Sequence, residues 1–176
     1  MTKVKWNIDS AHSGLDFSVK HMMVSRVKGT FHDFEASIVA DPEDLTTADI
    51  EFSVDLASID TRNEDRDNHL RTNDFFDIEN HPKLTFKATK IEKTGDDEYD
   101  VTGDMTIKGV TNTETFHVTY EGTASMGGNE VAGFTGEGKI NRKDYGMTYN
   151  AALETGGVLI GDQVKISIQI EASKEA

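Results

Sequence analysis

The sequence predicts an all-β fold: an eight-stranded antiparallel β-barrel with one short helix near residues 63–72 and one helical turn near 41–46. Apolar and polar residues alternate in eight segments, as in strands with one buried face. Half-exposed strands favour antiparallel pairing, because parallel strands covered on both faces are apolar throughout. Such a sheet must close on itself or split into a sandwich. We favour closure into one domain spanning residues 1–176, since the inward glycines at 103, 136 and 138 relieve crowding or leave room inside.

The eight strand segments follow one another through short polar connections. In the first, Leu15, Phe17 and Val19 alternate with polar residues, and His21 continues their inward phase. Glycine with Asp or Asn predicts turns between later segments, at 95–97, 109–112, 127–129 and 161–162. The predicted strands are residues 15–21, 34–40, 50–56, 84–89, 99–108, 116–121, 134–140 and 164–171.

Two helical segments interrupt the alternation. Asp41 followed by Pro42 is typical of an N-cap and first helical position, and it predicts a helical turn. Thr61, with Glu three residues later, has the spacing of a capping box. Asp67 and Arg71 then form a favourable i,i+4 pair. Because this segment contains a single large apolar residue, we expect the helix to lie across one end of the barrel.

Charge and composition exclude several partners. The chain has 18 basic and 32 acidic residues, a net charge of −14, and no cysteine. Cysteine chemistry, including disulfides and iron–sulfur clusters, is therefore excluded. A surface this acidic repels phosphate groups, so we expect neither nucleic-acid binding nor attachment to anionic membrane surfaces. No signal peptide or transmembrane segment is visible, which predicts a cytoplasmic protein, although an exported form with its signal removed would look the same.

Motifs for catalysis and metal binding are missing from the sequence. It contains no G-x-S-x-G, no P-loop, no G-x-G-x-x-G after a strand and no H-E-x-x-H. We therefore expect a protein that is not an enzyme and that uses no cofactor. The histidines share no short ligand spacing, and we expect no metal site. These histidines are His12, His21, His32, His69, His81 and His117.

Polar residues are expected at two places on the barrel interior. His21 lies on the apolar side at a strand end, where it either bonds to a backbone carbonyl or orients a ligand in an apolar pocket. Arg66 and His69 share one face of the predicted helix. They are suited to an anionic headgroup, whereas the structural alternative is that Arg66 pairs with a nearby carboxylate and holds the helix on the barrel.

Several motifs together resemble one family. The opening W-x-I-D-x-x-H-S-x-L-x-F-x-V-x-H, the block 66–77 (RDNHLRTNDFFD), and the segments 81–86, 103–111 and 142–147 are similar, in this order, to the YceI-like family of polyisoprenoid-binding proteins. The resemblance covers residues 5–171 and implies a lipocalin-like barrel with an elongated apolar cavity. It implies that Phe17, Val19 and His21 line the cavity and that Arg66 and His69 lie near its mouth. Further wall positions are expected at Phe52, Phe86, Met105, Ile107, Phe134, Gly136 and Ile168.

The resulting hypothesis is binding, with transport or storage, of a long-chain isoprenoid such as a polyprenyl diphosphate or an isoprenoid quinone, or of a similar amphiphilic lipid. One alternative is an enzyme that acts on an amphiphile through His21 or His69. Another is a structural or stress-related protein whose own side chains fill the barrel. A homodimer through one sheet edge is also compatible with the sequence, in which Val39 and Ile91 are the clearest outward apolar residues.

Overall fold

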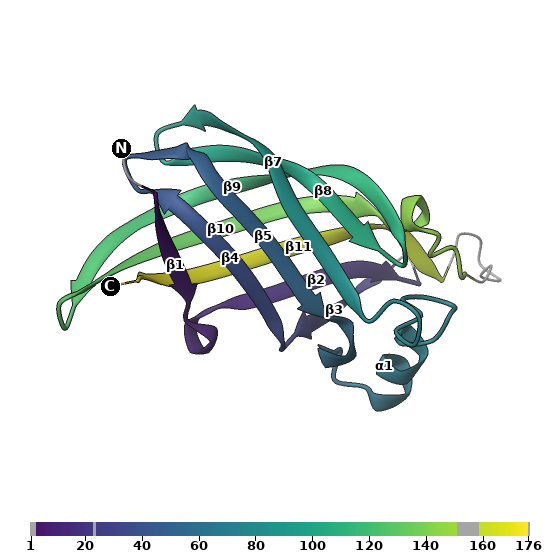
Figure 1. Ribbon diagram of the computed structural model, residues 1–176. Helices are drawn as coiled ribbons and strands as arrows, with labels where there is room; N and C mark the ends of the chain where they lie inside the picture. The colour runs from purple at the N-terminus through teal and green to yellow at the C-terminus, as the bar shows by residue number, and fades with distance from the viewer. Residues whose placement is uncertain (1–2, 23, 151–158, 176) are drawn as a thin grey trace.

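The computed structural model describes residues 3–22, 24–150 and 159–175. Figure 1 shows a strongly curved antiparallel sheet with α1 (Glu64–Leu70) below one end. Three 3-10 turns accompany it, η1 (Ser10–His12), η2 (Leu56–Ser58) and η3 (Arg142–Tyr145). The strands are β1 (Val4–Ile8), β2 (Gly14–His21), β3 (Ser25–Phe31), β4 (Phe34–Asp41), β5 (Asp44–Asp55), β6 (Ile59–Asp60), β7 (Lys83–Gly95), β8 (Glu98–Ile107), β9 (Val110–Met126), β10 (Asn129–Asn141) and β11 (Ile160–Lys174).

Eight of these strands form a closed ring, which confirms the predicted barrel. The ring runs β1-β4-β5-β7-β8-β9-β10-β11 and closes through the pairing of β1 with β11. Consecutive strands from β7 to β11 are neighbours, as in an up-and-down barrel. All eight predicted strand segments are strands in the structure.

The three strands that sequence analysis missed continue the first three predicted ones. β1 and β2 both pair antiparallel with β11, so they form one strand interrupted at η1. β3 and β4 are likewise one strand broken at residues 32–33, and β5 and β6 are one strand broken at η2. In β3 the inward alternation is present, but buried Gly29 stands at its centre and weakens the apolar pattern.

The predicted helical turn near 41–46 is wrong. Residues 42–43 form a tight turn between β4 and β5, and Asp41 and Asp44 are paired across it. The Asp41 carboxylate accepts a hydrogen bond from the Glu43 amide, at 2.9 Å. The Asp-Pro pair therefore builds a hairpin turn of the Asx type, in which Pro supplies the fixed φ that turns and helix starts share.

Strand irregularities account for two other errors. A register shift between Ala88 and Lys90 places Ile91 on the inner face, where it packs against the core. One extra residue reverses the alternation that follows it, so the outward position predicted for Ile91 is wrong. The turn predicted at 161–162 lies instead within β11, in an irregular stretch between the pairs Ile160–His21 and Val164–Val19.

The helix is where it was predicted, but its ends are held differently. Asn63, not Thr61, is the N-cap, and its side chain accepts the Arg66 amide. Asp67 does not pair with Arg71; its carboxylate accepts the amide and the hydroxyl of Thr61, at 2.9 and 2.5 Å. The Arg71 guanidinium instead donates to the carbonyls of residues 57 and 59. These bonds fix α1 beneath β6.

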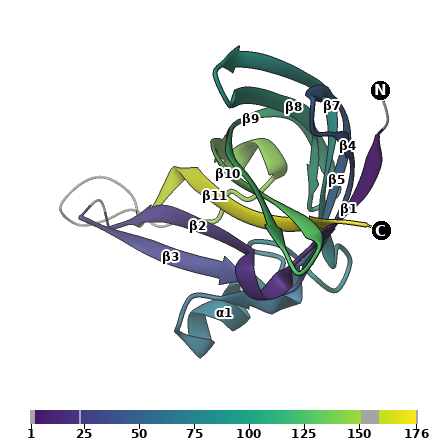
Figure 2. The same cartoon turned by 90° about the vertical axis from the view of Figure 1, so that its left-hand side faces the viewer.

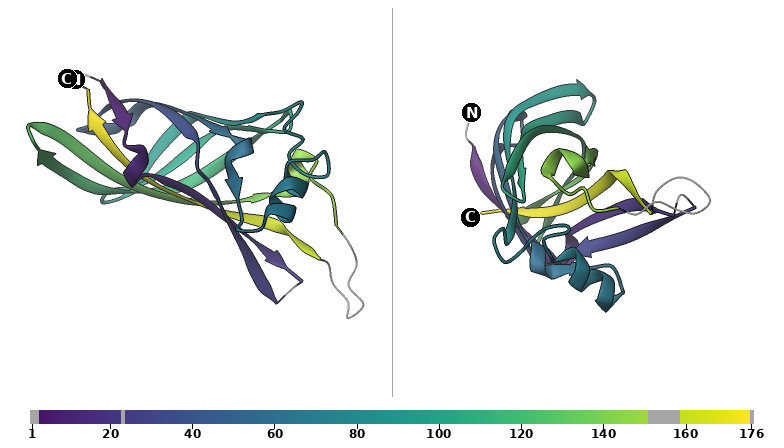
Figure 3. Two further views of the ribbon diagram at one scale, coloured as in Figure 1. Left: turned by 90° about the horizontal axis from the view of Figure 1, so that it is seen from below. Right: turned by 90° about the vertical axis from the view of Figure 1, so that its right-hand side faces the viewer.

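The paired strands β2 and β3 leave the barrel wall as an arm. In Figure 2 they project to one side of the ring formed by the other strands, with α1 next to them. Figure 3 shows the same arm from below, extending along the start of β11. The arm, α1 and η3 therefore share one end of the barrel, which we call the helix end, while both termini lie at the other end.

A cluster of His12, Asp9 and Glu171 holds the interruption between β1 and β2. The His12 Nδ1 atom lies 2.7 Å from Asp9 Oδ2 and 3.1 Å from Glu171 Oε2. The hydrogen bond to Asp9 raises the pKa of His12 and lowers the pKa of Asp9. This arrangement explains the D-x-x-H-S motif structurally. His12 holds the bend between β1 and β2 against β11, the strand with which both of them pair.

We predict that His12→Gln makes the protein's stability less dependent on pH. A histidine whose pKa is raised by folding stabilises the folded state fully below its ordinary pKa of about 6.5 and loses this effect as pH rises through the folded value. The melting temperature of wild type should therefore exceed that of His12→Gln most near pH 6, and the difference should shrink above pH 8. A difference independent of pH, measured by thermal unfolding, would contradict this role of the cluster.

Candidate ligand-binding cavity

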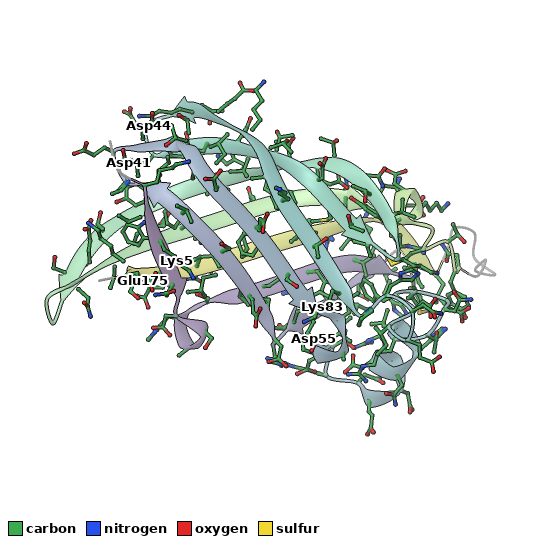
Figure 4. The ribbon with its side chains drawn as sticks, in the orientation of Figure 1. Lys5, Asp41, Asp44, Asp55, Lys83 and Glu175 are labelled. Atoms are coloured by element: carbon green, nitrogen blue, oxygen red, sulfur yellow. The ribbon has the colours of Figure 1, made fainter. Side chains whose placement is uncertain are left out.

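The barrel interior contains two adjoining chambers. The distal chamber, of about 150 Å³, lies between β4, β5 and β7–β11, and its walls include Ile50, Phe52 and Phe134. The helix-side chamber, of about 260 Å³, lies between β2, α1 and the segment after η3. In Figure 4, Asp41 and Asp44 label the turn between β4 and β5, next to Ala40 and Leu45 of the distal chamber, whereas Asp55 of β5 and Lys83 of β7 lie near α1.

Four apolar side chains separate the chambers and belong to both. Leu15, Leu84, Met105 and Ile166 line each of them. The first three are more than nine-tenths buried. None of the four is polar, so widening this constriction costs packing but leaves no hydrogen bond unmade. Met105 has an unbranched, flexible side chain that adapts to irregular space. The two chambers therefore adjoin across a constriction that contains no polar side chain.

Aromatic rings pack over two of the three inward glycines. A Cβ at Gly103 would lie 2.6 Å from the Phe86 ring, and one at Gly138 would lie 2.5 Å from the Phe116 ring. Phe86 and Phe116 pack edge to face at 5.3 Å. These two glycines thus relieve crowding and do not enlarge the cavity. Gly136 lines the distal chamber, but Ile168 covers it closely.

Arg66 brings a positive charge to the wall of the helix-side chamber. Its Nε donates to the Thr61 hydroxyl and its Nη2 to the Thr61 carbonyl, both at 2.7 Å. Among the described residues, no carboxylate forms an ion pair with Arg66 within 4.0 Å. The hydrogen bonds of Thr61 and buried Asp67 therefore position the guanidinium, and its charge remains available to an anionic group.

Aromatic rings surround His69 beside this charge. The His69 ring lies edge-on to Phe75 and to Tyr149, with centroids 5.1 and 4.8 Å apart. Its Nε2 atom lies 2.8 Å from Asp74 Oδ2. His21 lines the same chamber from β2. Polar groups thus converge at the helix end of an otherwise apolar cavity, the usual way in which a pocket orients an amphiphile.

Arg142 fixes the chain at the side of this chamber. Its buried guanidinium donates to the carbonyls of Gly161, Met147 and Tyr149 at 2.6–2.9 Å. Burial lowers the pKa of Arg142, and nearby Asp162 opposes that shift. Because its donors are occupied by backbone carbonyls, Arg142 positions Tyr149 and does not offer a free charge.

The structure places every predicted site residue on the wall of one of the two chambers. The helix-side chamber includes Phe17, Val19, His21, Arg66, His69 and Ile107. The distal chamber includes Phe52, Phe86, Phe134, Gly136 and Ile168, and Met105 lines both.

Sequence reasoning missed several wall residues. Leu15 has the same inward phase as Phe17, and Phe75 and Arg142 lie within motifs that the family resemblance used. The sequence carried a signal for these three. For Tyr149, which lies outside every strand pattern and motif, it carried none.

A closed antiparallel barrel with an internal apolar cavity is the architecture of lipocalin-like proteins. The YceI-like domain profile matches residues 6–172, and the chain belongs to that family. It is 47% identical over 171 residues to a UPF0312 protein of Staphylococcus epidermidis, covering 96% of this chain and 97% of the relative.

Solved structures share the fold. BcnA of Burkholderia cenocepacia superposes with a TM-score of 0.80 at 27% identity, covering 94% of this chain and 99% of BcnA. A polyisoprenoid binding domain from Saccharophagus degradans, implicated in plant cell wall breakdown, superposes with a TM-score of 0.68 at 12% identity, covering 98% and 99%. In the part of the chain that the structure describes, no helix has the length and apolarity needed to cross a bilayer.

We predict that Thr61→Val destabilises the protein by about 1–3 kcal/mol, because buried Asp67 loses one of its two donors and Arg66 loses an acceptor. Urea unfolding measures this change. The matched control is Thr113→Val on the exposed face of β9, where we expect little effect. Equal unfolding midpoints for the two variants would show that the Thr61–Asp67–Arg66 hydrogen bonds do not hold α1.

Proposed function

We propose that the protein binds a long-chain isoprenoid, such as a polyprenyl diphosphate or an isoprenoid quinone, or a similar amphiphilic lipid, and that it carries or stores this ligand without changing it chemically. The apolar chain would occupy the two chambers, and the polar headgroup would lie near Arg66 and His69. The name of the Saccharophagus degradans domain, which shares the fold, supports this ligand class.

The unfilled apolar volume is the observation that carries the proposal. Protein interiors pack closely and contain few voids larger than a water molecule. An apolar chamber of about 150 Å³ is far larger than such voids. A barrel filled by its own side chains would have no such volume. Occupation by an apolar chain would fill this space and add the free energy of burying the ligand's own surface.

The size of the chambers favours a narrow, extended ligand. Each chamber is smaller than the ~300 Å³ at which common small-molecule pockets begin, whereas the two joined exceed it. A compact ligand would fit poorly into either chamber. A chain that passes the constriction at Leu15 and Met105 would use both.

One geometric feature favours the enzymatic alternative: the hydrogen bond between His69 and Asp74 resembles the pairing of a general base with an orienting acid. The same bond equally fixes the His69 ring against Phe75 and Tyr149. The two functions differ in outcome, since a carrier returns its ligand with unchanged mass, while an enzyme releases a product.

The first test is native mass spectrometry of freshly purified protein, with lipid analysis of its solvent extract. We expect a stoichiometric adduct of one isoprenoid or fatty-chain mass. A clean apo mass, with no uptake of added prenyl lipids, would reject the proposal, and a converted lipid would favour the enzyme.

The variant Ala48→Trp tests whether the apolar chain of the ligand extends into the distal chamber. Ala48 lines the distal chamber on β5, and a Trp there would fill it. We expect uptake of long prenyl chains to fall at least tenfold while short chains still bind in the helix-side chamber. Thr47→Trp, on the exposed neighbouring position, is the matched control. If Ala48→Trp and Thr47→Trp both melt at the wild-type temperature and show the same preference for prenyl chain length, the ligand does not enter the distal chamber.

A further inference from the structure

Exposed apolar side chains gather at the helix end of the barrel. Among the described residues, the large apolar side chains that are exposed are Met22, Val24, Val110 and Tyr149. Val24 is 86% exposed and Met22 is 47% exposed, and both lie at the tip of the β2–β3 arm. Single exposed apolar residues need no explanation, but several at one end indicate a contact surface.

The other two exposed residues belong to the same end. Tyr149 packs on His69 and Phe75 at the helix-side chamber. Val110 follows the β8–β9 turn, which is held to the loop after α1 by a 2.6 Å hydrogen bond from Lys108 Nζ to the Asn73 carbonyl. Figure 1 shows these elements together at the end opposite both termini.

The arm is also the cationic part of an acidic protein. Between Asp16 and Asp33 the sequence has no acidic residue, while Lys20, Arg26 and Lys28 lie there in a chain of net charge −14. All three are exposed, and Lys20 is directly opposite Arg26 in the strand register. In the described part of the chain, none of the three forms an ion pair within 4.0 Å.

We propose that the tip of the β2–β3 arm docks the protein on an anionic lipid surface. Met22 and Val24 enter the headgroup layer, and Lys20, Arg26 and Lys28 face the lipid phosphates. An exposed apolar tip beside clustered cations has the two features that hold interfacial proteins on anionic bilayers. A nucleic acid would use the cations but offers no apolar layer for the tip.

The proposed docking revises the expectation, drawn from the net charge, that the protein does not attach to anionic membrane surfaces. The repulsion predicted for the whole chain acts through its acidic faces, and α1 itself begins with Glu64 and Asp65. Over distances near the Debye length of about 8 Å, the local charge of the arm decides the interaction. The acidic faces therefore orient the protein so that only the arm approaches the membrane.

On the proposed function, docking at this end brings the helix-side chamber next to the membrane. Val19, His21 and Val27 of the arm line the helix-side chamber on its inner face. A lipid leaving a bilayer beside the arm would enter the chamber without crossing water. The membrane contact itself requires no particular ligand and is tested separately.

The experiment is flotation of the full chain with phosphatidylcholine vesicles that contain or lack phosphatidylglycerol, at low and high salt. We expect binding to the phosphatidylglycerol vesicles that weakens at high salt. A basic residue near an anionic surface strengthens binding about fivefold, so Arg26→Gln/Lys28→Gln should bind roughly 25-fold more weakly. The matched control is Lys90→Gln/Lys93→Gln, which makes the same charge change at two exposed positions of β7.

The apolar contact is tested by Val24→Cys labelled with an environment-sensitive dye, because the chain has no other cysteine. We expect a blue shift on phosphatidylglycerol vesicles and none for the same dye at Ser125→Cys on β9. Lack of vesicle binding, equal loss in both charge variants, or binding to DNA but not to vesicles would overturn the proposal. Native mass spectrometry of the charge variants keeps ligand occupancy separate from docking.

Discussion

The fold depends on one edge of β11 serving two strands. Its first part pairs with β2 and its last part with β1, and the change of partner occurs where η1 bends the chain. The pairing with β1 closes the ring, although it spans only the positions from Trp6 to Ile8. Because β1 pairs with β4 while β2 pairs with β3, this division separates a closed barrel from a projecting arm. The cavity, its helix end and the arm all follow from it.

The sequence was a good guide to the strands and a poor guide to their irregularities. Period-2 alternation identified every strand of eight or more residues, since burial on one face imposes it directly. It failed where the backbone departs from regular pairing, as at the bulge before Ile91 and the Asx turn at Asp41. Such irregularities depend on partner strands distant in sequence. The same is true of the His12 cluster, because Glu171 joins it only through the closure of the barrel.

The candidate site shows the same limit. Inward phase predicted ten of the twelve chosen positions, and the face of the predicted helix gave the other two, Arg66 and His69; all twelve lie on the walls of the chambers. Their division between two chambers could not be predicted, because it depends on how side chains such as Leu15 and Met105 meet across the barrel. The hydrogen bonds of Arg66 could not be predicted either: its guanidinium is held by Thr61, whereas the sequence pointed to either an anionic headgroup or a carboxylate partner.

The breaks at η1, at residues 32–33 and at η2 interrupt three neighbouring strands and form a line of weaker pairing across the sheet. The chain at His32 and Asp33 bonds to Ser58, and Phe31 and Phe34 mark where pairing resumes on either side. Ladder hydrogen bonds are interrupted along this line, so unpairing of β2 from β11 would leave the β1–β11 closure of the ring intact. In the terms of native-state hydrogen exchange, we expect the arm to open at a lower free energy than the ring.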